Sequence, residues 1–124
     1  MDFRTLMSGI HTDELLSFLE HGKERAREAG YPLLVSLAQK IAVKLDPIEL
    51  FHAGAFLKGY RSFWANPVTN VCFVSFGATF TITADGEERL DIIRNELDKL
   101  FQGSVVDKPN KRGVGPLLFG GLRF

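Results

Sequence analysis

The sequence contains a single cysteine, no excess of either charge and no hydrophobic run long enough to span a bilayer. One cysteine excludes an internal disulfide and a four-cysteine zinc site. The 15 basic residues balance the 15 acidic ones, which disfavours nucleic acid and anionic membrane surfaces as partners. The N-terminus lacks the basic and then apolar pattern of a secretory signal. We therefore expect a cytoplasmic protein without nucleic-acid or membrane partners.

Apolar residues are abundant, at 45% of the sequence with 11 Phe. Such a chain is not expected to be disordered, because disorder requires few apolar residues and a high net charge. The 124 residues suit one domain that buries roughly two thirds of its unfolded surface. We therefore expect residues 1–124 to form a single domain.

The N-terminal half predicts a helix, a strand and a short helix. Thr12 is a candidate N-cap, and Gly30 is a candidate helix end. Between them an apolar stripe recurs at helical spacing, formed by Leu15, Phe18, Leu19, Gly22, Ala26 and Ala29. The alternation from Leu33 to Leu45 indicates a strand. Asp46-Pro47 then begins a short helix, with Asp as N-cap and Pro at the first helical position.

The C-terminal half predicts a hairpin, a helix and a final strand. A strand over 61–65 and a long strand over 71–83 flank a turn at Asn66-Pro67 and should pair antiparallel. Asp85 and Glu88 form a capping-box pattern before a helical stripe, made by Leu90, Ile93, Leu97, Leu100 and Phe101. Residues 103–115 indicate a loop and 116–124 a strand. The predicted class is α+β, an antiparallel sheet with flanking helices.

Residues that could carry chemistry are scattered. His11, His21 and His52 lack the spacing of metal ligands, and we expect His21 to lie at the boundary of its helix or in solvent. The carboxylates occur as helix caps or on exposed helix faces, which disfavours a paired acid/base site. The sequence therefore predicts no catalytic, cofactor-binding or metal-binding residue in this chain.

Other conspicuous residues have structural explanations. We expect Cys72, Phe63 and Trp64 in the core. Gly113-Val114-Gly115 lacks the remaining residues of a dinucleotide or phosphate loop. Gly120-Gly121 suggests a bulge or a close backbone approach within a strand. The basic run 108–112 has no interleaved aromatic residue, so we expect a solvated loop.

Four segments, taken in order, resemble a known family. They are Asp46-Pro47, the run Phe63-Trp64-Ala65-Asn66-Pro67, the segment Phe76-Gly77-Ala78, and Pro116-Leu117-Leu118-Phe119-Gly120-Gly121-Leu122-Arg123-Phe124. Their order and spacing are similar to those near the start of isochorismate synthases. The resemblance runs from about Leu33 to Phe124.

The resemblance implies the N-terminal part of a four-layer α/β/β/α fold with two orthogonal sheets. Enzymes of this family convert chorismate to isochorismate in menaquinone or siderophore biosynthesis. They use a lysine base, a general acid and Mg²⁺ held by glutamates. These residues lie in the later, C-terminal part of the family sequence, and none maps onto this chain.

The resemblance thus implies a non-catalytic N-terminal domain or fragment that scaffolds the missing catalytic half, its expected partner. Two alternatives remain open at this point. One is a stand-alone module that binds a small aromatic acid. The other is a structural domain that forms homodimers through an exposed edge at 117–124, because unprotected strand edges recruit partners.

Overall fold

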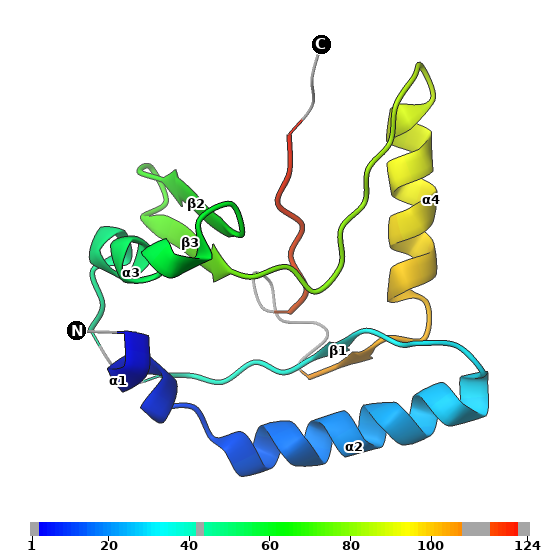
Figure 1. Ribbon diagram of the computed structural model, residues 1–124, viewed down its shortest axis with the longest axis horizontal. Helices are drawn as coiled ribbons and strands as arrows, with labels where there is room; N and C mark the ends of the chain where they lie inside the picture. The colour runs from blue at the N-terminus through cyan, green and yellow to red at the C-terminus, as the bar shows by residue number, and fades with distance from the viewer. Residues whose placement is uncertain (1–2, 42–43, 108–114, 122–124) are drawn as a thin grey trace. The chain divides into compact units, whose positions relative to one another are not determined.

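A computed structural model of the chain describes residues 3–41, 44–107 and 115–121. The chain divides into two compact units. One consists of Met1–Ile10, Lys40–Thr81 and Phe119–Phe124, and the other of His11–Gln39 and Ile82–Leu118. Each unit combines helices with a two-stranded sheet (Figure 1). The predicted α+β class is therefore confirmed.

The first unit is built around a β-hairpin. β2 (Arg61–Asn66) pairs antiparallel with β3 (Val71–Phe76), in register from Arg61 opposite Phe76 to Asn66 opposite Val71. Asn66 stabilises the turn, because its Oδ1 accepts a hydrogen bond from Val68 N at 3.0 Å. The hairpin predicted from the sequence is confirmed.

β3 ends at Phe76, so the predicted strand to Thr83 is wrong in its second half. Gly77 has φ 78°, a left-handed conformation that breaks the extended backbone. Its N–H donates to Tyr60 O at 2.6 Å, which closes the end of the hairpin. The alternating pattern beyond Gly77 meets no partner strand in the described part of the chain, and alternation without a partner does not make a ladder.

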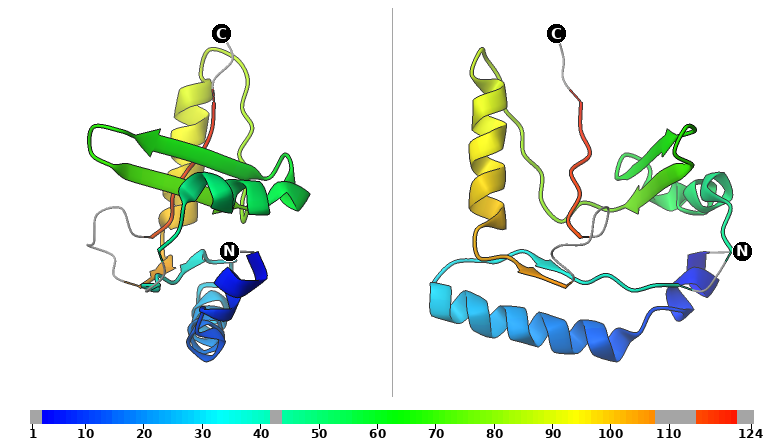
Figure 2. Two further views of the ribbon diagram at one scale, coloured as in Figure 1. Left: turned by 90° about the vertical axis from the view of Figure 1, so that its left-hand side faces the viewer. Right: turned by 180° about the vertical axis from the view of Figure 1, so that it is seen from behind.

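One side of the hairpin is covered by α3 (Pro47–Ala53), which continues into the short 3₁₀ helix η1 (Ala55–Leu57), as Figure 2 shows. Asp46 caps α3 as predicted, its Oδ1 accepting hydrogen bonds from Ile48 N (2.9 Å) and Glu49 N (3.1 Å). Gly54 lies so close to Phe76 that a Cβ there would overlap the ring. The unit also contains α1 (Phe3–Ser8), which no sequence pattern predicted.

The second unit begins with α2 (Thr12–Ala29), the long amphipathic helix expected from the sequence. Gly30, with φ 77°, ends it as predicted, and its N–H donates to Ala26 O at 2.9 Å. Thr12 is not the N-cap, because the helix already includes it and the N-cap is His11. The start of α2 is instead held by Gln39, whose amide exchanges hydrogen bonds of 3.0 Å with His11 N and His11 O.

Gly22 is the buried residue of α2, and its position explains a glycine inside a helix. A Cβ at Gly22 would overlap Cγ2 of Val35. The helix backbone therefore packs directly on β1 (Val35–Ser36). The cost of glycine to the helix, about 1 kcal/mol, permits this close approach.

β1 pairs in parallel with β4 (Val105–Val106), with Val35 opposite Val105. The predicted strand over 33–45 is therefore wrong beyond these two residues in the part that the structure describes; residues 42 and 43 lie outside it. The predicted loop over 103–115 is also wrong at β4. The strand is short because its partner offers only two residues, and a strand requires a partner ladder.

α4 (Arg89–Phe101) confirms the third predicted helix but not its cap. The N-cap is Glu88 rather than Asp85, because Gly86 has φ 89° and directs a turn in which Arg89 N donates to Gly86 O. The predicted final strand is not observed over residues 116–121, and 122–124 lie outside the described residues.

Burial is shallow in the described part of the chain. Val105 is the one buried hydrophobic side chain there, with 8% of its surface exposed. Many large apolar side chains are instead exposed, among them Leu16, Tyr31, Phe56, Trp64 and Leu90. The extensive burial expected from the length and composition is not found within these residues. No helix in the same ranges combines the length and the apolar character that a membrane span requires.

Candidate functional site

The three histidines do not form a site. His11 precedes α2, His21 lies within α2 and His52 lies within α3, and all three are exposed. The solvated position predicted for His21 is confirmed. Within the described ranges, no group of three or more His, Cys, Asp or Glu residues is arranged to hold a metal ion.

The aromatic pair at the centre of β2 is not in a core, and that prediction is wrong. Phe63 is 41% exposed and Trp64 is 47% exposed. Cys72, expected to be buried, is half-buried on β3. Trp64 is exposed because it lies on the face of the two-stranded sheet that no described helix covers. Phe63 and Cys72 lie on the face that α3 covers, and the short helix covers them only in part.

The glycine-rich segment gives no phosphate or dinucleotide loop in the described residues. Gly113, Val114 and the basic run 108–112 lie outside them. No described atom lies within 4 Å of a Cβ built at Gly120 or Gly121. The bulge or close backbone approach predicted at these two glycines is not observed among the described residues.

A small hollow of about 90 Å³ lies at the start of α3, lined by Lys44, Leu45, Asp46, Glu49 and Leu50. Typical small-molecule pockets measure about 300–1,000 Å³. Oδ1 of Asp46, the acidic residue at the cap, already accepts two backbone hydrogen bonds. This hollow is a feature of the helix cap and is much smaller than an active site.

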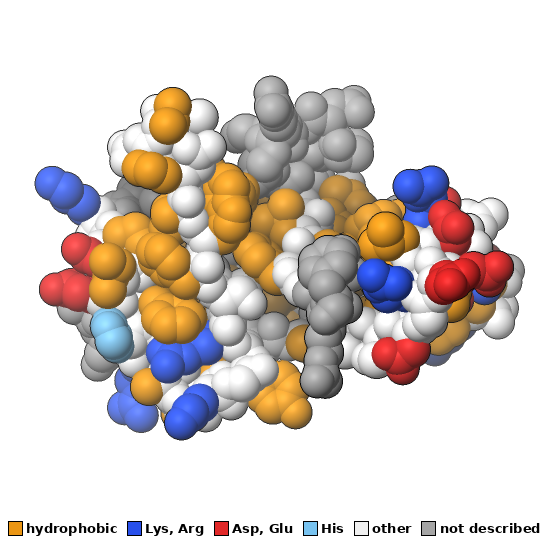
Figure 3. Space-filling model, turned by 90° about the horizontal axis from the view of Figure 1, so that it is seen from above, with side chains coloured by type: hydrophobic (Ala, Val, Ile, Leu, Met, Phe, Trp, Pro, Cys, Tyr) orange, Lys and Arg blue, Asp and Glu red, His pale blue; other side chains and the backbone are white. Residues whose placement is uncertain are grey.

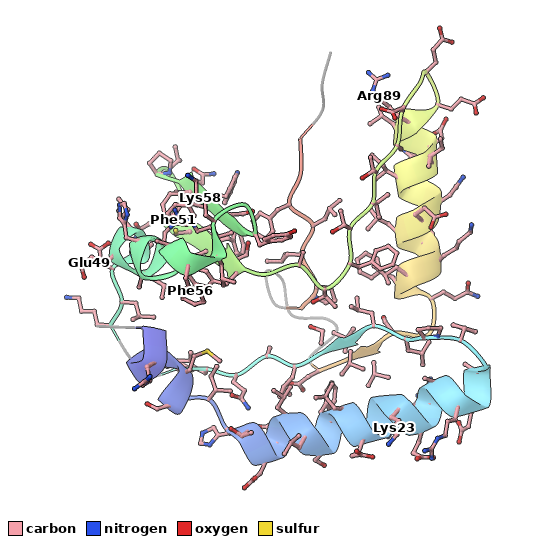
Figure 4. The ribbon with its side chains drawn as sticks, viewed as in Figure 1. Lys23, Glu49, Phe51, Phe56, Lys58 and Arg89 are labelled. Atoms are coloured by element: carbon pink, nitrogen blue, oxygen red, sulfur yellow. The ribbon has the colours of Figure 1, made fainter. Side chains whose placement is uncertain are left out.

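The α3-facing side of the hairpin is held by an aromatic and cationic stack around Phe51, a residue of α3 that is labelled in Figure 4. Arg61 lies over the Phe51 ring, with its Cζ 4.1 Å from the ring centroid, and its Nη1 donates to Phe51 O at 2.5 Å. Phe63 meets the same ring edge-on at 5.9 Å. These contacts fix α3 to the sheet, so this side of the hairpin is already occupied.

The opposite side, here called the open face, carries Ser62, Trp64 and Asn66 from β2 and Val71, Phe73 and Ser75 from β3. Alternate residues of a strand point to opposite sides, and the register places Trp64 directly across from Phe73. Their ring centroids are 5.6 Å apart. Phe119 adds a third ring, 6.4 Å from Phe73 and edge-on to it.

In the space-filling view (Figure 3), hydrophobic side chains gather over the hairpin and α3, with charged side chains at their edge, and acidic and basic side chains alternate over α4. The open face was missed at the sequence level because Trp64 and Phe63 were assigned together to a core. The signal was present, since neighbouring residues of a strand cannot share a face. The arrangement has the chemistry of an interaction surface, with aromatic groups at its centre and hydroxyl and amide groups around them.

Comparison with known proteins identifies the family. Residues 20–124 match the sequence profile of the family described as "Chorismate binding enzyme". The chain is 30% identical over 111 residues to isochorismate synthase MenF of Bacillus subtilis (strain 168). That alignment covers 84% of this chain and 23% of the relative. No solved structure matches it significantly.

The chain thus spans about a quarter of the length of its curated relative. The segments that suggested the family from the sequence, from Asp46-Pro47 to the C-terminal run, all lie inside the matched range. The family match extends over most of the chain and agrees with the mixed helix and strand architecture. The chain belongs to the chorismate-binding enzyme family.

Proposed function

We propose that this chain is a non-catalytic N-terminal domain of an isochorismate synthase, and that it scaffolds the catalytic remainder of that enzyme in the cytoplasm. The single observation that carries the proposal is the coverage of the alignment, 84% of this chain but 23% of the relative. The pathway implied by the resemblance is menaquinone or siderophore biosynthesis.

The exposed hydrophobic surface supports the same proposal. Monomeric proteins rarely leave contiguous apolar patches exposed, and such patches mark interaction sites. Here the hairpin exposes Trp64 and Val71 on one face, while α3 covers the other. A part of a larger enzyme would leave such a surface for the rest of the polypeptide.

We assign the Mg²⁺ of the family to the remainder of the enzyme. Magnesium is bound by carboxylate oxygens in near-octahedral geometry. Along the described residues the carboxylates form no such group, and Asp46 is engaged at its helix cap. These residues do not fit a Mg²⁺ site, and no chemical step is derived through one.

Complementation tests the proposal. The chain is co-expressed with the portion of Bacillus subtilis MenF outside the matched segment, and conversion of chorismate to isochorismate is measured with Mg²⁺. We expect turnover at least tenfold above that of the MenF portion alone. Equal turnover with and without this chain would contradict the scaffolding role.

The two alternatives predict different results. A stand-alone module for a small aromatic acid would show saturable heat on titration with chorismate. A homodimer through 117–124 would sediment as a dimer without any other polypeptide. The scaffolding proposal expects neither.

A further inference from the structure

We propose that the open face of the hairpin, centred on Trp64, is the surface that docks the remainder of the synthase polypeptide. This inference rests on the proposed function and adds to it the docking surface. It concerns the side of β2 and β3 opposite α3.

The residues of the open face have the distribution of an interface. The register gives three cross-strand pairs, Ser62 with Ser75, Trp64 with Phe73, and Asn66 with Val71. The aromatic pair is therefore central, and polar side chains flank it at both ends. Interfaces commonly have an aromatic centre and a polar rim, and Trp is enriched among the residues that dominate binding energy.

Charge defines the kind of partner. None of the six open-face positions carries an ionisable side chain. A surface for nucleic acid or an anionic headgroup would present Lys or Arg. The α2 and α4 surfaces differ, because they carry exposed ion pairs such as Arg27–Glu24 and Lys99–Glu96. The open face is therefore suited to an apolar polypeptide surface.

The chain itself shows what the open face accepts. The Phe119 ring, from the segment after α4, lies edge-on to Phe73 at 6.4 Å. An aromatic side chain on a polypeptide segment is therefore already in place at this face. Trp64 remains 47% exposed and Val71 43% exposed, so the contact leaves these two side chains accessible, while the other four residues of the open face are half-buried.

The comparison with MenF indicates which polypeptide would cover the open face. The alignment covers 23% of MenF, so most of an enzyme of that type lies outside the part that this chain matches. The other side of the hairpin is held by the Arg61–Phe51 stack and is not available. We therefore commit to the synthase remainder as occupant, rather than to a second copy of this chain.

Trp64 provides a direct probe, because it is the only tryptophan in the sequence. The full chain is labelled with 5-fluorotryptophan, which gives one ¹⁹F resonance, and is titrated with the unlabelled MenF portion outside the matched segment. We expect a saturable shift of that resonance. A resonance that does not move while binding is seen by sedimentation would overturn the inference.

Two matched variants separate the open face from the rest of the hairpin. Val71→Lys places a charge on the open face, whereas Val68→Lys places the same charge at the turn, where Val68 is 92% exposed. Both leave the Trp64 probe in place. We expect Val71→Lys to weaken binding of the MenF portion at least tenfold and Val68→Lys to leave it within twofold, with far-UV circular dichroism confirming the fold of each.

The outcomes distinguish this inference from the proposed function. The fold of the MenF portion is checked first by far-UV circular dichroism, and if the wild-type chain does not bind the folded portion, both fail. If wild type and Val71→Lys bind equally, the open face is not the docking surface, while the scaffolding role stands. A ¹⁹F shift that grows with the concentration of the chain alone would overturn the chosen occupant in favour of a second copy.

Discussion

The two units make their sheets in contrasting ways. In the first, β2 and β3 are joined by a turn of four residues and pair over six positions. In the second, β1 and β4 pair over two positions, although Val35 and Val105 are far apart in the sequence. Local pairing depends on the turn and the alternating pattern, whereas distant parallel pairing depends on packing. The hairpin could therefore be predicted from the sequence, and the parallel pair could not.

The largest expected change in stability concerns the contact between Gly54 and Phe76, which joins α3 to the hairpin in the first unit. In Gly54→Ala the new methyl group would overlap the Phe76 ring. Overpacking of this kind costs about 1–3 kcal/mol, and we expect the upper part of that range because the glycine is buried between α3 and the hairpin. Urea denaturation measures the change. Gly120→Ala, where no described atom lies within 4 Å of the new Cβ, is the control. Equal stabilities for the two variants would show that α3 does not pack as described.

The corresponding contact in the second unit should give a smaller effect. Gly22→Ala gains about 1 kcal/mol of helix propensity but overlaps Val35. We expect a net loss of about 1 kcal/mol, because the overlap costs about 1–3 kcal/mol. In the background of Val35→Ala the same substitution should stabilise the chain, since the overlapping methyl group is gone. A double-mutant cycle in urea measures the coupling, and additive effects would contradict the contact.

The helix caps provide a finer comparison. Asp46 makes two capping hydrogen bonds to α3, whereas the His11 side chain makes none to the described helix α2. Asp46→Ala should therefore cost about 1 kcal/mol. His11→Asp should gain about 0.5–1 kcal/mol, because it adds a cap and a negative charge at the helix N-terminus. Thermal denaturation of each variant gives the sign, and a stabilising Asp46→Ala would refute the cap.

The smallest expected effect concerns the exposed ion pairs of α2. Arg27 Nη1 lies 2.7 Å from Glu24 Oε1, with both side chains more than half exposed. Such pairs contribute about 0.2–0.5 kcal/mol and weaken with salt. Glu24→Gln should therefore change stability by less than about 0.5 kcal/mol. A larger change that persists at high salt would mean that the α2 surface packs against something other than water.

The helices were the most predictable elements, and their ends were less so. The apolar stripes located α2 and α4, because helical periodicity is a property of the local sequence. The caps of both helices were displaced, since Gly86 turned the backbone before α4 and Gln39 held the start of α2 from 28 residues away. A side chain so distant in the sequence leaves no local signal.

The strands were less predictable than the helices, because a strand also depends on a partner that is distant in the sequence. Alternation over 33–45 and 77–83 predicted extended pairing that the described residues do not contain, because no partner ladder is present there. The same reasoning missed β4 inside a predicted loop and placed Trp64 in a core. The alternation of apolar and polar residues specifies which side chains share a face of a strand. Whether that face is covered depends on the segments of the chain that pack against it.

The family could be predicted from the sequence, whereas the open face could not. The family was identifiable from ordered motifs around Phe63-Trp64 and the C-terminal run, and the comparisons confirm it. The open face became evident only when the register placed Trp64 opposite Phe73 and α3 on the other side. On this face Trp64 is 47% exposed, whereas the sequence had placed it in a core.

The most direct test of the account follows product formation by the purified 124-residue chain supplied with chorismate and Mg²⁺. The proposed scaffolding role predicts no isochorismate above the uncatalysed background at any chain concentration, because it assigns the catalytic groups to the remainder of the enzyme. Turnover that rises in proportion to the concentration of the chain would contradict it.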